Sequence, residues 1–221
     1  MERPREKVIM YGVQALSNRE LLAVLLRTGY QGKSSLDIAD EVIKHTNGIM
    51  NLPNMTLQDW MNFKGIKEAK AIELMTVFEL VRRCSFEYAK SVDVISSPET
   101  LVQWLKRELG HLQQEHFLVV FLNVKNHVIG YKTIFVGGLD AANIHPREIF
   151  KEAFSRSAKK IVLVHNHPSQ DVLPSKEDQK ITMLLSDVSK IMHIPIVDHI
   201  IVSSSSCFSF RKHGLLMEAI V

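Results

Sequence analysis

The chain has 221 residues, of which 46% are hydrophobic and 23% are charged, and its formal net charge is +3 at pH 7. These values are ordinary for a soluble globular protein and allow one large or two small domains with buried cores. No apolar run approaches the roughly 18 residues of a membrane span, and the charged segment at residues 1–7 is no signal peptide.

The positive charge is spread evenly along the chain, so neither half has the concentrated basic face of a strong nucleic-acid binder. Cys84 and Cys207 are far apart in sequence and are expected to be free thiols. We therefore expect a cytoplasmic protein that does not associate with membranes.

Residues 1–90 are predicted to form a small all-helical domain. Ser17 and Glu20 have capping-box spacing and open a helix over residues 21–26, which Gly29 ends. Further helices are predicted over residues 36–44, 56–61 and 69–83. In the last of these, six apolar residues are expected to pack inward: Ala71, Ile72, Leu74, Met75, Phe78 and Leu80.

The turn between the last two helices, at residues 63–71, resembles a helix-hairpin-helix turn. The usual Gly-apolar-Gly form of that turn directs backbone N–H groups and a helix N-terminus at a DNA phosphate. Gly65 and Ile66 fit the pattern, but Lys67 replaces the second glycine and places a side chain where backbone would approach the phosphate. We expect a structural hairpin with weak or no DNA binding through residues 63–71.

A serine-containing connector places the domain boundary near residues 90–97, with a second domain over residues 98–221. Its strands and helices alternate, which is typical of an α/β fold with helices packed on a sheet. Strands are predicted at residues 117–123, 128–136, 160–164, 196–202 and 207–210, and helices at residues 98–109, 146–159 and 175–192.

Two histidines and an aspartate lie where a predicted strand ends and a predicted helix begins. His165 and His167 are two residues apart and so face the same side of the strand, which Pro168 ends. Ser175 is a predicted N-cap, and Asp178 stands three residues later with capping-box spacing. Two imidazoles and one carboxylate are a normal ligand set for a catalytic zinc, which keeps its fourth position open for water.

The spacing of His165, His167, Ser175 and Asp178 resembles the JAMM (JAB1/MPN) metalloprotease motif. The surrounding residues, His-Asn-His-Pro-Ser and Pro-Ser-x-x-Asp, are similar to those of the RadC family, also called the UPF0758 family. The resemblance runs nearly end to end, and it implies a JAB/MPN α-β-α sandwich with a mixed sheet for the second domain. The other segments that carry it are residues 3–7, 15–23, 26–29, 145–153 and 198–202.

The resemblance also implies a function. It implies a zinc-dependent hydrolase that cleaves an amide or isopeptide bond in a peptide substrate, with metal-bound water as the nucleophile. The zinc ligands implied are His165, His167 and Asp178.

A JAMM site also needs a base, which is a glutamate upstream of the two histidines. Glu115 precedes the first predicted strand and fits that pattern better than Glu148, which lies in the first turn of a predicted helix. Ser175 resembles the JAMM serine that helps to hold the water and the developing oxyanion, and it is also a plain N-cap.

Several alternatives stay open. Asp171 is a rival ligand by residue type, although its spacing fits the motif less well. His199 is a candidate hydrogen-bond partner for a ligand, with ordinary packing as the other interpretation. Gln170 stands where the family commonly has glycine. Two other functions are a DNA-associated accessory protein in repair or recombination, which the hairpin supports, and a zinc-bearing scaffold without turnover.

Overall fold

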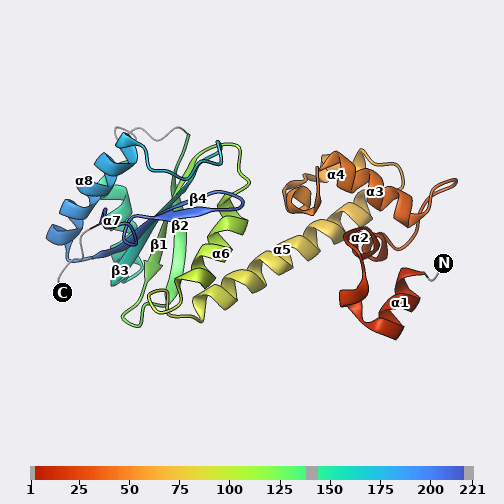
Figure 1. The fold of residues 1–221 in the computed structure, drawn as a ribbon, viewed down its shortest axis with the longest axis horizontal. Helices are drawn as coiled ribbons and strands as arrows, with labels where there is room; N and C mark the ends of the chain where they lie inside the picture. The colour runs from red at the N-terminus through yellow and green to blue at the C-terminus, as the bar shows by residue number, and fades with distance from the viewer. Residues whose placement is uncertain (1–2, 138–143, 217–221) are drawn as a thin grey trace. The chain divides into compact units, whose positions relative to one another are not determined.

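The computed structural model describes residues 3–137 and 144–216. The chain divides into two compact units, Met1–Cys84 and Ser85–Val221. Among the described residues, the first unit has one hydrophobic core cluster and the second has two. Figure 1 shows the helices of the first unit and the sheet of the second.

The first unit is helical, as predicted. Ser17, Ser34 and Thr56 are N-caps, and each forms a capping box with the acidic residue three positions later. The core of this unit surrounds the fully buried side chain of Trp60. The elements are α1 (Pro4–Tyr11), η1 (Val13–Ala15), α2 (Asn18–Leu26), α3 (Ser35–His45), η2 (Ile49–Asn54), α4 (Leu57–Met61) and α5 (Glu68–Lys90).

Helix α5 is longer than predicted and buries fewer of its apolar residues. It continues to Lys90 instead of ending at residue 83, because Ala89 near its end is buried in a core cluster of the second unit. Ala71 and Leu74 are buried, but Ile72 is 49% exposed and Leu80 is 61% exposed, so the prediction that they pack inward is wrong. The prediction for Met75, which is 37% exposed, is wrong as well, because only one side of the helix faces the small core.

The turn that joins α4 to α5 is a tight one around Gly65. The N–H of Ile66 donates to the carbonyl of Phe63, and Gly65 has a φ of 91°, a conformation that favours glycine. The ammonium group of Lys70 is bonded within the unit, to the carbonyls of Thr28 and Gly65. Lys67 is exposed.

The second unit is an α/β structure around a five-stranded mixed sheet, which confirms the predicted fold class. The sheet order is β2-β1-β3-β4-β5, and the β3–β4 pair is parallel whereas the others are antiparallel. Its elements are α6 (Pro98–Leu109), β1 (His116–Leu122), β2 (Val128–Val136), α7 (Pro146–Ser155), β3 (Lys160–Asn166), α8 (Lys176–Met192), β4 (Ile196–Val202) and β5 (Cys207–Ser209).

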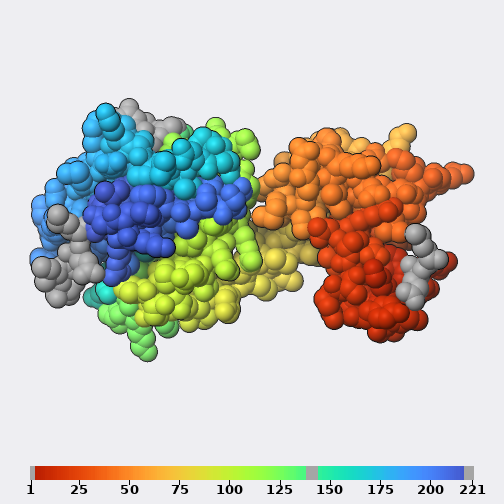
Figure 2. Space-filling model, in the orientation of Figure 1, coloured from red at the N-terminus to blue at the C-terminus, as the bar shows by residue number. Residues whose placement is uncertain are grey.

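Helices cover both faces of this sheet, so the unit has three layers (Figure 1). Alternate residues of β1 point to opposite faces. Phe117 and Val119 pack with α7 and α8, whereas Leu118 and Val120 pack with α6. The space-filling view shows α8, in light blue, on the surface of the unit (Figure 2).

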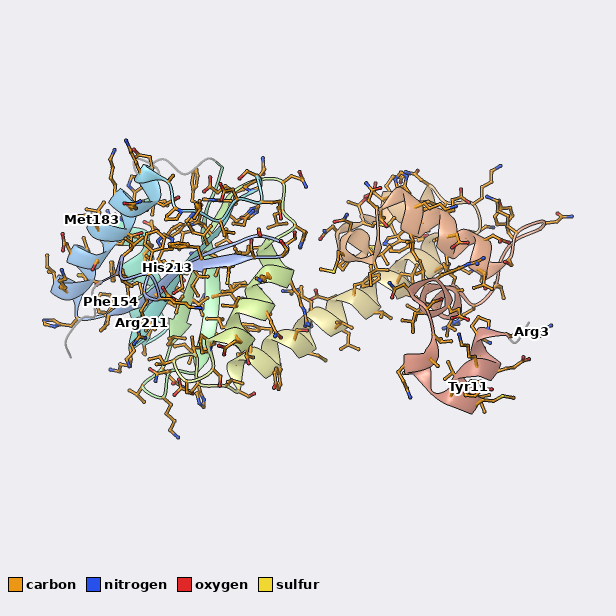
Figure 3. All side chains as sticks on the ribbon, in the orientation of Figure 1. Arg3, Tyr11, Phe154, Met183, Arg211 and His213 are labelled. Carbon is orange, nitrogen blue, oxygen red and sulfur yellow. The ribbon has the colours of Figure 1, made fainter. Side chains whose placement is uncertain are left out.

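The outward sides of α7 and α8 carry exposed apolar side chains. Phe154 on α7 is 54% exposed and Met183 on α8 is 66% exposed (Figure 3). Among the described residues, no helix is both long enough and apolar enough to cross a membrane.

Candidate metal centre

The structure brings four predicted site residues together at one end of the sheet. Glu115, His165, His167 and Asp178 each offer one ligand atom, and these atoms all lie within 4.8 Å of one another. His165 lies near the end of β3, His167 follows that strand, and Asp178 lies in the first turn of α8. This group could hold a metal ion.

The local geometry follows from the strand end and the helix start. The backbone N–H of Ser175 donates to Asp178 Oδ2 at 2.7 Å, and Ser175 Oγ accepts from the Asp178 N–H at 3.1 Å. The capping box of α8 therefore fixes the carboxylate of Asp178 while it closes the helix end. The His165 ring is completely buried and lies with Nε2 3.1 Å from Asp178 Oδ1.

A chain of hydrogen bonds fixes the tautomer of His165. The hydroxyl of Thr182 lies 2.5 Å from the carbonyl oxygen of Asp178, which can only accept, so the hydroxyl donates. Thr182 Oγ1 must then accept from His199 Nδ1, at 2.6 Å. A neutral His199 leaves Nε2 as an acceptor, and this atom lies 2.9 Å from His165 Nδ1. His165 therefore carries its proton on Nδ1 and presents the Nε2 lone pair to the site.

The neutral state of His199 follows from its surroundings. Complete burial, which disfavours the charged imidazolium, lowers the pKa of His199 well below its ordinary value. The ring also stacks on Phe210, with the ring centroids 4.7 Å apart. His199 thus contacts a ligand of the candidate site as well as packing in the core.

His167 is oriented in the same sense by a backbone carbonyl. Its Nδ1 lies 2.6 Å from the carbonyl oxygen of Asp171, which can only accept, so the proton is on Nδ1. When both rings are neutral, the Nε2 lone pairs of His165 and His167 face each other at 3.0 Å, beside the carboxylate of Asp178. Lone pairs that converge at such distances repel one another unless a cation lies among them.

The carboxylate of Asp178 supports the fit of a cation. Asp178 Oδ1 is buried and has no hydrogen-bond partner among the described residues. Burial opposes its ionisation, but the contacts with His165 and His167 outweigh burial and hold the pKa of Asp178 well below its usual range. Burial likewise acts to lower the pKa of His167, and the bonds to Asp178 and Asp171 outweigh burial and raise it. Both shifts express a site that favours positive charge.

The structure places the candidate base Glu115 in the four-residue group, and places Glu148 and the rival ligand Asp171 outside it. Glu115 precedes β1 and is half-buried, with Oε1 3.9 Å from His165 Nε2. Glu148 is exposed in the first turn of α7 and is not part of the four-residue group. Asp171 is also outside the group, and its carboxylate accepts the N–H of Leu173.

Ser175 and Gln170 border the site without belonging to the ligand group. Ser175 is the N-cap of α8, and its catalytic role stays a prediction. Gln170 has a φ of 68°, a left-handed conformation that explains why glycine suits this position. The Gln170 side chain bonds to the carbonyl of Gly110 and to the hydroxyl of Ser204, which ties the loop after the histidines to two other loops.

Sequence reasoning missed two polar residues beside the ligands, Thr182 and Asn166. Thr182 stands four residues after Asp178, a spacing that places both on one side of a helix. Asn166 lies between the two histidines, where strand alternation turns it to the opposite face of the sheet.

Comparisons with known proteins agree with this architecture. Residues 95–215 match the family described as RadC-like JAB domain, and residues 1–72 match the one described as UPF0758 N-terminal. A UPF0758 protein from Bacillus mycoides is 44% identical over 214 residues, which cover 96% of this chain and 95% of that protein. A UPF0758 protein from Bacillus cereus has the same identity and coverage.

Proposed function

We propose that this chain, which belongs to the UPF0758 family and carries a RadC-like JAB domain, is a zinc-dependent hydrolase of the JAMM type. The bond cleaved would be an amide or isopeptide bond in a peptide substrate. The observation that carries the proposal is that the Nε2 atoms of His165 and His167 converge on Asp178 Oδ1, a buried atom with no hydrogen-bond partner among the described residues.

The donor set of this point favours zinc. Zinc accepts imidazole nitrogen and carboxylate oxygen in tetrahedral sites, and catalytic zinc commonly has three protein ligands. His165, His167 and Asp178 would be those ligands. A zinc ion held by these residues would act as a Lewis acid and would lower the pKa of a water in the open position to about 7.

The remaining roles fall to side chains of this chain. Glu115 Oε1, on the edge of the group, would take a proton from the attacking water and later deliver it to the leaving amine. The hydroxyl of Ser175 would donate to the oxygen that becomes negative, which can contribute about 3 kcal/mol to transition-state stabilisation. Incubation of zinc-loaded protein with a library of short peptides and lysine-linked isopeptides, read by mass spectrometry, tests the proposal.

His199 supplies a prediction about zinc affinity. His199→Phe keeps a ring against Phe210 but removes the acceptor of the His165 Nδ1 proton. We expect zinc affinity to fall about 10- to 100-fold, as for other partners of metal-bound histidines. Competition with a chromophoric chelator measures it, with Phe210→Leu as a control for packing. Wild-type affinity in His199→Phe together with a loss in Phe210→Leu would mean that packing is the whole role of His199.

For the first unit we propose weak or no DNA binding through residues 63–71. The hairpin exposes Lys67, but Lys70 is occupied by internal carbonyls. If the hairpin does bind a DNA duplex, the affinity should fall steeply with salt and should be weakened further by Lys67→Glu. A salt-titrated binding assay on the full chain measures this, with Lys125→Glu, at an exposed lysine between β1 and β2 of the second unit, as a charge-matched control.

Tight binding at physiological salt, abolished by Lys67→Glu and kept in Lys125→Glu, would contradict that expectation. It would favour the alternative function, a DNA-associated accessory protein.

A further inference from the structure

Asn166 is a buried polar residue that lies between two candidate ligands and faces away from them. Its side chain is fully buried at the end of β3. Because side chains alternate along a strand, His165 faces α8 whereas Asn166 faces the layer that contains α6. It therefore meets the segment that joins α6 to β1, and that segment carries Glu115.

The amide of Asn166 uses its nitrogen on that segment and its oxygen on the first residue of β1. Its Nδ2 donates to the carbonyl of Leu112 at 3.2 Å and to the carbonyl of Gln114 at 3.0 Å. Its Oδ1 accepts the backbone N–H of His116 at 2.8 Å. Two of these three bonds flank Glu115 directly, one on each side.

The residue that follows β2, on the other side of β1, also fixes the backbone of Glu115. The carbonyl oxygen of Glu115 accepts the N–H of Gly137, at 2.9 Å. The backbone at Glu115 is thus fixed from β3 through Asn166 and from the end of β2 through Gly137. His165 and Asn166 are consecutive residues of β3. The hydrogen bonds of Asn166 therefore connect the backbone beside Glu115 to the residue next to His165.

We infer that Asn166 is a positioning residue that sets the place of the Glu115 carboxylate relative to the ring of His165. The inference rests on the proposed function for the role of Glu115, but the geometric link can be tested without turnover. Asparagine suits the task because one side chain supplies two N–H donors and one acceptor. An aspartate of the same shape would turn an oxygen toward the carbonyls of Leu112 and Gln114.

The experiment compares Asn166→Asp and Asn166→Ala with wild type, and uses Ser189→Ala as a matched control. Ser189 is buried in α8 and donates to a backbone carbonyl, that of Ser186, so its loss also removes one buried hydrogen bond. Zinc content, melting temperature, amide hydrogen exchange and hydrolysis of the peptide and isopeptide library are measured on the full chain. NMR contacts between the Glu115 side chain and the His165 ring report their proximity.

We expect both Asn166 variants to keep zinc and to lose the NMR contact between Glu115 and His165. Exchange of the His116 amide should become on the order of tenfold faster. Asn166→Ala removes the acceptor of this amide, and in Asn166→Asp the carbonyls of Leu112 and Gln114 repel the carboxylate that replaces it. Hydrolysis should fall about 100-fold, toward the level of Glu115→Gln, because the base is displaced. The double variant Asn166→Asp/Glu115→Gln should be no slower than Glu115→Gln alone, because both substitutions act on the same base.

Three results would overturn the inference. The first is an unchanged Glu115–His165 contact in both variants, and the second is a loss of hydrolysis in proportion to lost zinc. The third is the same pattern in Ser189→Ala, which would make the effect one of general stability. If wild type cleaves nothing, the proposed function fails, and the NMR contact and the His116 exchange still decide whether Asn166 positions Glu115.

Discussion

Glu115→Gln is expected to reduce hydrolysis by about 100- to 10,000-fold while the protein keeps its fold and its zinc. The substitution preserves the size of the side chain and removes the group that would accept the proton of the attacking water. His165, His167 and Asp178 are untouched, and Glu115 Oε1 lies farther from His165 Nε2 than Asp178 Oδ1 does, at 3.9 Å against 3.1 Å. Elemental analysis and the cleavage rate of the same preparation give the two numbers.

Glu148→Gln is the matched control for this prediction. Glu148 is also a glutamate near the start of an element in the second unit, but it is exposed in the first turn of α7 and lies outside the four-residue group. Its substitution should leave the cleavage rate within about twofold of wild type, as for most surface changes. An active Glu115→Gln beside an inactive Glu148→Gln would transfer the base to Glu148.

His167→Ala is expected to remove the zinc. Wild type should bind about one zinc per chain, and a three-ligand site that loses one imidazole keeps two ligands, too few for a stable catalytic site. In the metal-free variant, the carboxylate of Asp178 also loses a neighbour whose nitrogen lies 3.5 Å away. Elemental analysis after dialysis against a weak chelator measures the stoichiometry.

His213→Ala is the control for His167→Ala. His213 is exposed, and its Nδ1 contacts a backbone carbonyl, as the Nδ1 of His167 does. Equal zinc content in wild type, His167→Ala and His213→Ala would exclude His167 from the ligand set. It would also remove the central reason for a JAMM-type reaction.

The proximity of His165, His167 and Asp178 could be predicted from local sequence. A strand alternates its faces every two residues, and a capping box fixes the third residue of a helix, so both patterns can be read from spacing. An α/β structure with helices packed on a sheet followed from the alternation of strands and helices, whereas the three-layer arrangement was implied by the family resemblance.

The residues that orient the ligands could not be predicted, because their contacts depend on the order of the strands. His199 meets His165 because β4 pairs with β3 in a register that places Leu163 beside His199. Asn166 reaches the residues before β1 because β3 and β1 are neighbours in the sheet. No local spacing in the sequence specifies either pairing.

The length of α5 was missed for a related reason. A prediction from the spacing of apolar residues assumes that a helix packs against one core. Helix α5 instead contributes Leu74 to the core of the first unit and Ala89 to a core of the second. Its exposed residues between those two positions, such as Leu80, lack the burial that their apolar character predicts. Tertiary context therefore decides both the end of the helix and the burial of its residues.

Removal and return of zinc, with the peptide and isopeptide library as substrate, tests whether hydrolysis depends on zinc held by His165, His167 and Asp178. We expect that zinc-loaded wild type cleaves a subset of amide or isopeptide bonds, that metal-stripped protein cleaves none, and that added zinc restores cleavage. Glu115→Gln, loaded with zinc to the same stoichiometry, should stay inactive. Cleavage that is equal in zinc-loaded, stripped and Glu115→Gln protein, or no cleavage by zinc-loaded wild type, would contradict the account.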